Sequence, residues 1–173
     1  ITVSTSGIVP GMVELANAGT GVCLAVSLNA PSQEEREAIM PITKKYPLAD
    51  VLDVCRKYQF GKHKRVTFEY VLLHGVNDRE EHAHRLRKLM RGTPCKINLI
   101  PFNPNSALPY ERPDREAVES FAKILKDDNY TVSVRWSNRC RNGPVAADAS
   151  PFWPATTTRG FDATPGWCDG VPP

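Results

Sequence analysis

The sequence lacks closely spaced cysteines of the kind that hold zinc or iron–sulfur clusters. Its five cysteines lie far apart, and no Cys-x-x-Cys or Cys-x-x-x-Cys-x-x-Cys motif occurs. A Gly-x-Gly-x-x-Gly loop and a Walker loop are also missing, so the sequence gives no sign of nucleotide binding through a glycine cradle. We therefore predict that the chain supplies no metal ligands and keeps its thiols reduced in a reducing compartment.

Long apolar runs and a strong charge of one sign are missing as well. No segment reaches the roughly 18 apolar residues of a membrane-spanning helix, and the first residues, Ile-Thr-Val-Ser, show no basic or apolar leader. Lys and Arg number 22 against 19 Asp and Glu, which leaves a net charge of only +3. We expect a cytoplasmic protein without membrane contact, whose charge permits a polyanionic partner but does not indicate one.

Apolar runs of strand length alternate with helical patterns along the chain. The 173 residues are enough for one ordinary core. Because no tight hairpin signal separates the apolar runs, the alternation predicts βαβ units and a parallel sheet, either open or curled into part of a barrel. The predicted strands cover residues 1–6, 22–28, 66–73, 96–101 and 130–136.

Helix-capping residues occur between these runs. Ser32 and Glu35 have the spacing of a capping box, which predicts that a helix starts there. Asp78 is placed to cap a later helix, and Gly92 is placed to end it. Pro10 is interpreted as part of the turn that closes the first strand.

Polar side chains follow several of the predicted strands. In parallel α/β folds the ligand lies at the carboxyl ends of the strands, where the loops converge on one crevice. We predict that four of these residues line one crevice, although the alternative that they satisfy turn backbone remains open. The four residues are Ser4, Ser27, Asn29 and Asn103.

Two further signals have a structural and a functional interpretation. Glu69 is a carboxylate in an otherwise apolar strand, so its side chain points into a polar barrel lumen or pairs with an arginine. His82 and His84 look like a metal-binding pair, but residues two apart on a helix point to different faces. We therefore predict that these histidines lie on a solvated helix surface.

Several blocks of sequence, among them VSTSGIVP at 3–10, LAVSLNA at 24–30 and TPCKINLIPFNP at 93–104, occur in an order that resembles the RlmN/Cfr family of radical S-adenosylmethionine methyltransferases. Enzymes of this family methylate adenine in ribosomal and transfer RNA. The resemblance runs from residue 1 to about residue 135. The other blocks that carry it are MPI at 40–42, EYVL at 69–72 and GVND at 75–78.

The resemblance implies a fold, cofactors and substrates. The fold would be a partial (β/α)6 barrel, of which residues 1–136 supply the last four barrel strands and one appended strand. The cofactors would be S-adenosylmethionine and a [4Fe-4S] cluster, and the substrates 23S rRNA and tRNA, methylated at C2 of adenine. Asn29 stands where many relatives have histidine, and it cannot titrate near neutral pH. The contacts to S-adenosylmethionine, carried over residue by residue, would be Ser4, Ser27, Leu28, Asn29 and Asn103.

The chain also departs from the family pattern at both ends. The cysteine loop that holds the cluster would lie before residue 1. The family's methyl-carrying cysteine segment is replaced by a stretch around Cys140, to which we assign no catalytic role. Residues 137–173 are rich in proline and glycine and are predicted to be a disordered tail, which a shifted reading frame would explain.

These departures leave three functional hypotheses. The first is a carboxyl-terminal part of an adenine-C2 methyltransferase, with no catalytic residue of its own and inactive as an isolated chain. The second is the C8-methylating branch of the family, which confers antibiotic resistance. The third is a noncatalytic remnant that at most binds RNA through Lys and Arg contacts to phosphate. The sequence does not determine the oligomeric state.

Overall fold

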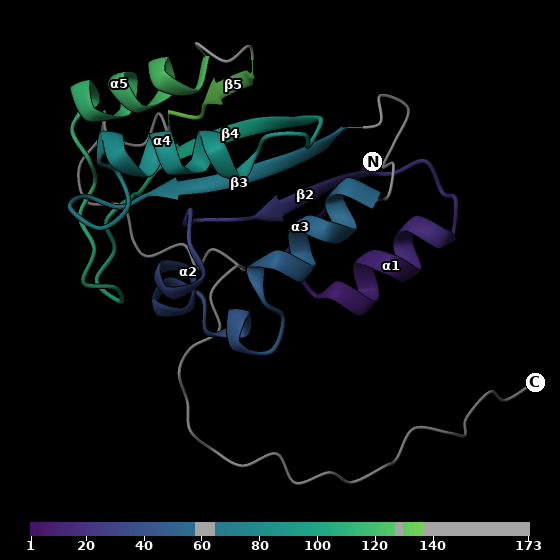
Figure 1. The fold of residues 1–173 in the computed structure, drawn as a ribbon. Helices are drawn as coiled ribbons and strands as arrows, with labels where there is room; N and C mark the ends of the chain where they lie inside the picture. Colours follow the sequence, from purple (N-terminus) through teal and green to yellow (C-terminus); the bar gives the residue numbers. More distant parts are fainter. Residues whose placement is uncertain (58–64, 127–129, 137–173) are drawn as a thin grey trace, which may run out of the picture. The chain divides into compact units, whose positions relative to one another are not determined.

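The computed structural model describes residues 1–57, 65–126 and 130–136. The chain divides into two units, Ile1–Gly143 and Pro144–Pro173. The second unit lies outside the described residues, as does the whole of the tail predicted at 137–173. The described part of the first unit has an α/β fold (Figure 1).

A parallel five-stranded sheet forms the centre of this unit, with the strand order β1-β2-β3-β4-β5. Every neighbouring pair is parallel, which confirms the prediction made from the missing hairpin signals. All five predicted strands are present, with somewhat different ends. Their bounds are Thr2–Thr5 (β1), Cys23–Ser27 (β2), Val66–Leu72 (β3), Cys95–Pro101 (β4) and Thr131–Val134 (β5).

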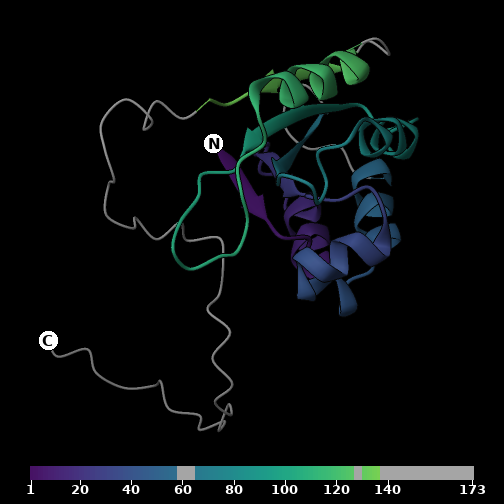
Figure 2. The same cartoon turned by 90° about the vertical axis from the view of Figure 1, so that its left-hand side faces the viewer.

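Helices connect successive strands and cover one face of the sheet. They lie in front of the strands in Figure 1, and Figure 2 shows them to one side of the sheet. None of the helices in the described ranges is long and apolar enough to cross a membrane. The helices are α1 (Val9–Asn17), α2 (Gln33–Ile39), the 3-10 helix η1 (Pro41–Lys44), α3 (Leu48–Lys57), α4 (Glu80–Leu89) and α5 (Arg115–Lys126).

Two helix starts differ from the sequence-based predictions. Helix α1 was not predicted, because Pro10 suggested a turn; Pro10 instead lies in the first helical turn, where no backbone N–H is needed. Asp78 does not cap α4, since Arg79 is the N-cap and Asp78 Oδ1 accepts a hydrogen bond from Gly75 N–H at 3.0 Å. The predicted start of α2 is confirmed by Glu35 N–H, which donates to Ser32 Oγ at 3.3 Å.

The core lies between the sheet and its helices. Strand β3 alternates buried and half-buried residues along its length, so one face packs on the helices and the other does not. Phe68 and Tyr70 are fully buried on the helix-covered face, and the Tyr70 ring lies 5.4 Å from that of Phe121 in α5. Burial of each such side chain contributes about 1.5–3 kcal/mol, so this face holds the unit together. The opposite face of β3 carries the half-buried residues.

Candidate cofactor site

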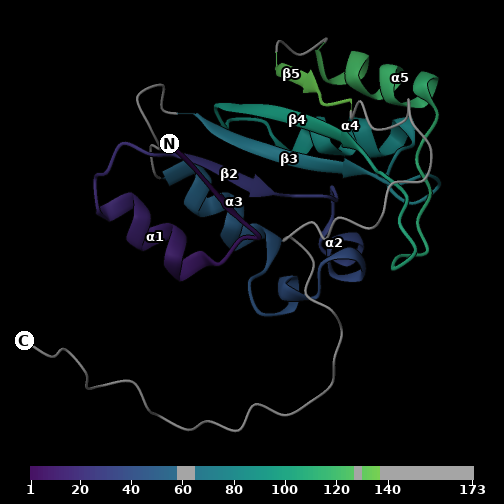
Figure 3. The same cartoon turned by 180° about the vertical axis from the view of Figure 1, so that it is seen from behind.

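Figure 3 shows the sheet from the side opposite to that of Figure 1, with the strands in front of most of the helices. The strand register places polar residues near the strand ends on this face. Leu24 and Val26 of β2 are buried on the helix-covered face. Because successive strand residues alternate, Ala25 and Ser27 point to the other face. Ser4 of β1 is in register with Ala25, so its side chain points the same way. The structure therefore places the predicted residues Ser4 and Ser27 on one open face.

A row of polar residues crosses this open face. The register aligns Ser27 of β2 with Glu69 of β3, then with Asn98 of β4 and Ser133 of β5. Ser133 Oγ donates to Asn98 Oδ1 at 3.1 Å, which shows that their side chains share the face. The Glu69 side chain forms no ion pair or hydrogen bond with the residues that the structure describes. It lies on the face away from the helices, so pairing with an arginine is not seen among the described residues, and its position in a polar barrel lumen stays a prediction.

Asn98 and Ser133 were not singled out from the sequence. Their signal is the period of two along each strand, because both occupy the same alternate positions as Glu69 once the register is known. Within a single strand, one polar residue does not show that it lines up with polar residues of the neighbouring strands. The register is a tertiary property, so the row becomes visible only in the folded sheet.

Leu28 and Asn29 follow Ser27, and the protein itself holds their backbone. Leu28 is fully buried, and its N–H donates to Glu69 O at 2.8 Å. Asn29 has a left-handed conformation, with φ of 59°, and its Oδ1 accepts from Val71 N–H at 2.9 Å. Its Nδ2 lies 3.2 Å from Met40 Sδ. The shape of this segment is therefore set before any ligand binds.

Asn103 lies beyond the end of β4, at the same end of the sheet as Ser27. It is exposed, and the preceding residue, Phe102, donates its N–H to Leu72 O at the end of β3. This bond ties the loop after β4 to the neighbouring strand. The segment that carries Asn103 thus starts from a fixed point at the carboxyl edge of the sheet.

Among the residues that the structure describes, Arg36 of α2 is the largest fully buried side chain, with 0% of its surface exposed. Its Nε donates to Leu28 O at 3.1 Å, and its Nη2 donates to Ser27 O at 3.0 Å and Ser6 O at 2.7 Å. Its Nη1 donates to Thr43 Oγ1 at 2.8 Å. Burial lowers the pKa of Arg36 to about 10, which still leaves it charged at neutral pH. One guanidinium therefore joins the ends of β1 and β2.

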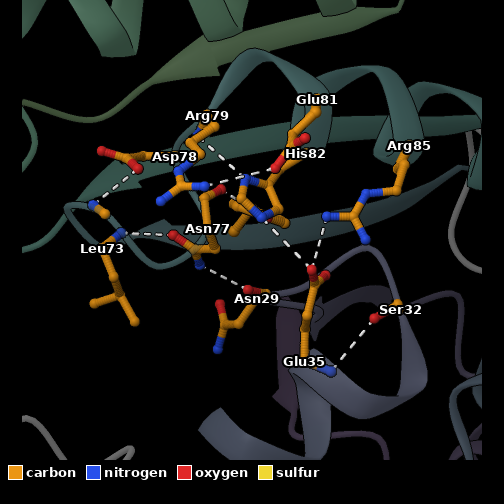
Figure 4. A network of polar contacts seen from close by, with 12 residues as sticks. Asn29, Ser32, Glu35, Leu73, Asn77, Asp78, Arg79, Glu81, His82 and Arg85 are labelled. Carbon is orange, nitrogen blue, oxygen red and sulfur yellow. Dashed lines mark hydrogen bonds and ion pairs between the residues drawn. The ribbon is translucent and has the colours of Figure 1, made fainter.

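Asn77 performs a similar task between β2 and β3 (Figure 4). Its side chain is fully buried. Asn77 Oδ1 accepts from Leu73 N–H at 2.7 Å, and Nδ2 donates to Asn29 O and Val71 O, both at 2.8 Å. Every polar atom of the amide is thus hydrogen-bonded to backbone. The sequence showed Asn77 only as part of a family block, and its role as a latch depends on contacts between distant segments.

Helix α4 is also joined to α2 through Glu35, as Figure 4 shows. Arg85 Nη2 donates to Glu35 Oε1 at 2.7 Å, and His82 Nε2 lies 3.5 Å from the same oxygen. His82 Nδ1 accepts from Arg79 N–H at 3.2 Å, and His82 is only 5% exposed. The prediction of a solvated surface is therefore wrong for His82, which faces α2, and is confirmed for the exposed His84.

The described cysteines do not fit an iron–sulfur cluster. Cys55 and Cys95 are buried, and burial raises the pKa of their thiols to about 12 and about 11, so both remain protonated at neutral pH. Cluster ligands are thiolates. Within the described ranges, no group of three His, Cys, Asp or Glu side chains is placed to hold a metal ion. No reaction step is assigned to a metal on these residues.

Known proteins similar to this chain share one description. A protein of Anaeromyxobacter sp., described as dual-specificity RNA methyltransferase RlmN, is 48% identical over 147 residues, which cover 85% of this chain and 38% of that protein. A protein of Rhodospirillum rubrum with the same description is 51% identical over 136 residues, covering 78% of this chain and 32% of the relative. No protein-family model matches the chain.

Solved structures also resemble this chain. A radical SAM methyltransferase from Sphaerobacter thermophilus matches with a TM-score of 0.76 and 44% identity, over 80% of this chain and 40% of that one. A domain of a pyruvate-formate lyase-activating enzyme from Bacteroides vulgatus matches with a TM-score of 0.61 but 16% identity, which shows the fold alone. The parallel sheet is thus of radical SAM type, and the chain spans about two fifths of the curated relatives that it matches.

Proposed function

Because the chain is homologous to part of the RlmN dual-specificity RNA methyltransferases, we propose that it forms part of a radical S-adenosylmethionine enzyme that methylates C2 of adenine in 23S rRNA and tRNA. The observation that carries this proposal is the 48% identity over 85% of the chain. The identity extends through most of the folded unit. Such an enzyme would work in the cytoplasm, where its RNA substrates are.

The open face of the sheet is the proposed binding site for S-adenosylmethionine. Ser4, Ser27 and Asn103 supply neutral hydrogen-bonding groups at the carboxyl ends of the strands, which suits a polar cofactor. Leu28 and Asn29 contribute the fixed backbone shape described above. The bound cofactor would supply the methyl group and the radical chemistry, while the cluster ligands would lie on parts of the enzyme other than the described residues.

Binding of S-adenosylmethionine to the 173-residue chain tests the site. Isothermal titration calorimetry of the wild type should show one site, and Ser27→Ala should weaken it about threefold to tenfold, the effect of one lost hydrogen bond. Ser120→Ala, at a half-buried position on α5 in the helix layer, is the matched control and should leave the dissociation constant unchanged. Equal effects of the two variants would contradict this site.

Asn103 has its own matched pair of variants. Asn103→Ala should weaken binding of S-adenosylmethionine, because the exposed amide is proposed to contact the cofactor directly. Asn17→Ala, at the exposed carboxyl end of α1, removes the same amide from the opposite end of the sheet. A titration in which Asn103→Ala binds as tightly as Asn17→Ala would remove Asn103 from the site.

A chimeric enzyme tests the reaction. In the chimera, residues 1–135 replace the matching segment of the Anaeromyxobacter relative, and the host lacks its own enzyme of this kind. We expect 2-methyladenosine in 23S rRNA and tRNA by nucleoside mass spectrometry, with the unaltered relative as control. Formation of 8-methyladenosine would instead support the C8 branch. A folded chimera that methylates neither position would contradict the proposal.

The isolated chain tests what the segment can do by itself. Expressed alone in the same host, it should leave adenosine unmethylated, because the described residues offer no cluster site and the buried thiols of Cys55 and Cys95 stay protonated. A gel shift with rRNA fragments across a range of salt concentrations separates the noncatalytic RNA-binding alternative from no binding at all. Any 2-methyladenosine from the isolated chain would overturn its proposed inactivity.

A further inference from the structure

We propose that Arg36 is a positioning residue for the cofactor site: its guanidinium fixes the backbone at the ends of β1 and β2, so affinity for S-adenosylmethionine depends on a side chain that does not touch it. The inference rests on the proposed function, because it concerns the same site. It adds a residue that no sequence motif marked.

The contacts of Arg36 converge on the segments that carry Ser4 and Ser27. Three of its four hydrogen-bond acceptors are the backbone carbonyl oxygens of Ser6, Ser27 and Leu28. Ser6 follows the last residue of β1, and Ser27 is the last residue of β2. A guanidinium has its N–H groups in a rigid planar fork, so binding several carbonyls at once fixes their relative directions.

Fixing a carbonyl also fixes the side chain beside it. The Ser27 carbonyl points to Arg36, so the peptide plane that follows Ser27 cannot rotate without breaking a bond of 3.0 Å. The backbone sets the direction of the Ser27 Cα–Cβ bond, and with it the place on the open face from which the hydroxyl projects. Arg36 therefore acts on the site through Ser27 and does not need to reach the open face.

The packing around the guanidinium leaves little room for another arrangement. A Cβ added to Gly7 would lie 3.1 Å from Arg36 Nη2 and 3.0 Å from Val51 Cγ2. The turn after β1 thus lies directly against the guanidinium and α3. Gly7 also has φ of +97°, a conformation that other residues rarely adopt. The glycine allows the backbone to approach Arg36 closely enough for the Ser6 carbonyl to bind.

Replacing Arg36 should affect both the stability of the fold and the order of the strand ends. No carboxylate of the described residues lies within hydrogen-bond distance of Arg36, and burial lowers its pKa to about 10. A buried charge without a counterion costs free energy. Removing the guanidinium would in turn leave buried carbonyl oxygens without a donor, so Arg36→Met should also lower the free energy of unfolding. What an apolar side chain cannot do is hold three carbonyl oxygens in place. The specific loss expected on substitution is therefore order at the strand ends.

The test combines two readouts on the full chain. Isothermal titration with S-adenosylmethionine measures affinity, and amide hydrogen exchange measures order at residues 28–30 relative to β4, which Arg36 does not contact. The variants are Arg36→Lys, which keeps the charge but not the fork, and Arg36→Met. Arg85→Met is the matched control. The Arg85 guanidinium, on α4, contacts the side chain of Glu35, which lies next to Arg36 on α2, and it contacts no strand end.

We expect Arg36→Lys and Arg36→Met to weaken binding of S-adenosylmethionine by about tenfold or more. Exchange at residues 28–30 should accelerate, while β4 remains protected. Arg85→Met should keep the wild-type dissociation constant. An Arg36 variant that folds and binds as the wild type does would overturn the inference.

Two other outcomes are also decisive. If both Arg36 variants fail to fold, Thr43→Val takes their place, since it removes the hydroxyl that accepts from Arg36 Nη1 at 2.8 Å and donates to Arg36 O at 3.5 Å. An unchanged dissociation constant in Thr43→Val would then overturn the inference. If the wild type itself does not bind S-adenosylmethionine, the proposed cofactor site fails, while the chimera still tests the proposed reaction. Hydrogen exchange still decides whether Arg36 orders the strand ends, and unchanged exchange in Arg36→Lys would refute it.

Discussion

Replacing Asn77 by alanine should destabilise the fold strongly. The side chain is fully buried and binds Leu73 N–H, Asn29 O and Val71 O at 2.7–2.8 Å. Each of these three backbone groups, left without its partner in the interior, costs about 1–3 kcal/mol, so the expected loss is about 3–9 kcal/mol. That is a large part of the roughly 5–15 kcal/mol by which a typical domain is stable. Urea unfolding followed by circular dichroism measures it, with an expected fall in the midpoint of about 2 M.

An exposed asparagine provides the control. Asn17→Ala, at the end of α1, should change the free energy of unfolding by no more than about 0.5 kcal/mol. Asn77→Asp has the same shape as the wild type but directs one carboxylate oxygen at the carbonyl oxygens of Asn29 and Val71, so it should be at least as harmful as Asn77→Ala. A loss below about 1 kcal/mol in Asn77→Ala would refute the latch.

Three further changes follow from single contacts. Gly7→Ala should destabilise by about 1–3 kcal/mol, because its Cβ would lie 3.0 Å from Val51 Cγ2, whereas Gly11→Ala within α1 should be neutral or stabilising; equal urea midpoints would contradict this. Tyr70→Phe should cost about 1 kcal/mol in urea unfolding, since the hydroxyl donates to a buried carbonyl at 3.0 Å, and no loss would argue against that bond. Burial raises the pKa of Cys55 to about 12, so above about pH 8.5 the unfolded thiol loses a proton that the folded one keeps. The free energy of unfolding should therefore fall as the pH rises towards 12, and Cys55→Val should show a shallower fall.

The strands were predictable because their signal is local. Each is a run of β-branched and apolar residues, and alternation with helical patterns is enough to predict parallel order. The same local reasoning failed for α1, where Pro10 has two meanings: it can end a strand or begin a helix. Only the packing of α1 on the sheet decides between them.

The candidate site was predictable in part, for a related reason. Polar residues at strand ends are visible in the sequence, which is how Ser4 and Ser27 were singled out. The residues that hold those ends were not visible, because Arg36 binds Ser6 from 30 residues away and Asn77 binds Asn29 from 48 residues away. A buried arginine and a buried asparagine look like surface residues in a sequence. Their partners are backbone atoms, which leave no mark in composition or periodicity.

The parallel order of the sheet also affects how the protein emerges from the ribosome. No strand can pair with its neighbour until the helix between them has been synthesised, and Ala25 of β2 must wait for Thr67 of β3. Closing such long loops costs entropy before any pairing compensates for it, which makes sheets of this kind slow to form. During that interval the backbone N–H and C=O groups of β2 that later pair with β3 are unpaired, so they can pair with another chain. We therefore expect nascent chains that end between β2 and β3 to depend most on chaperones.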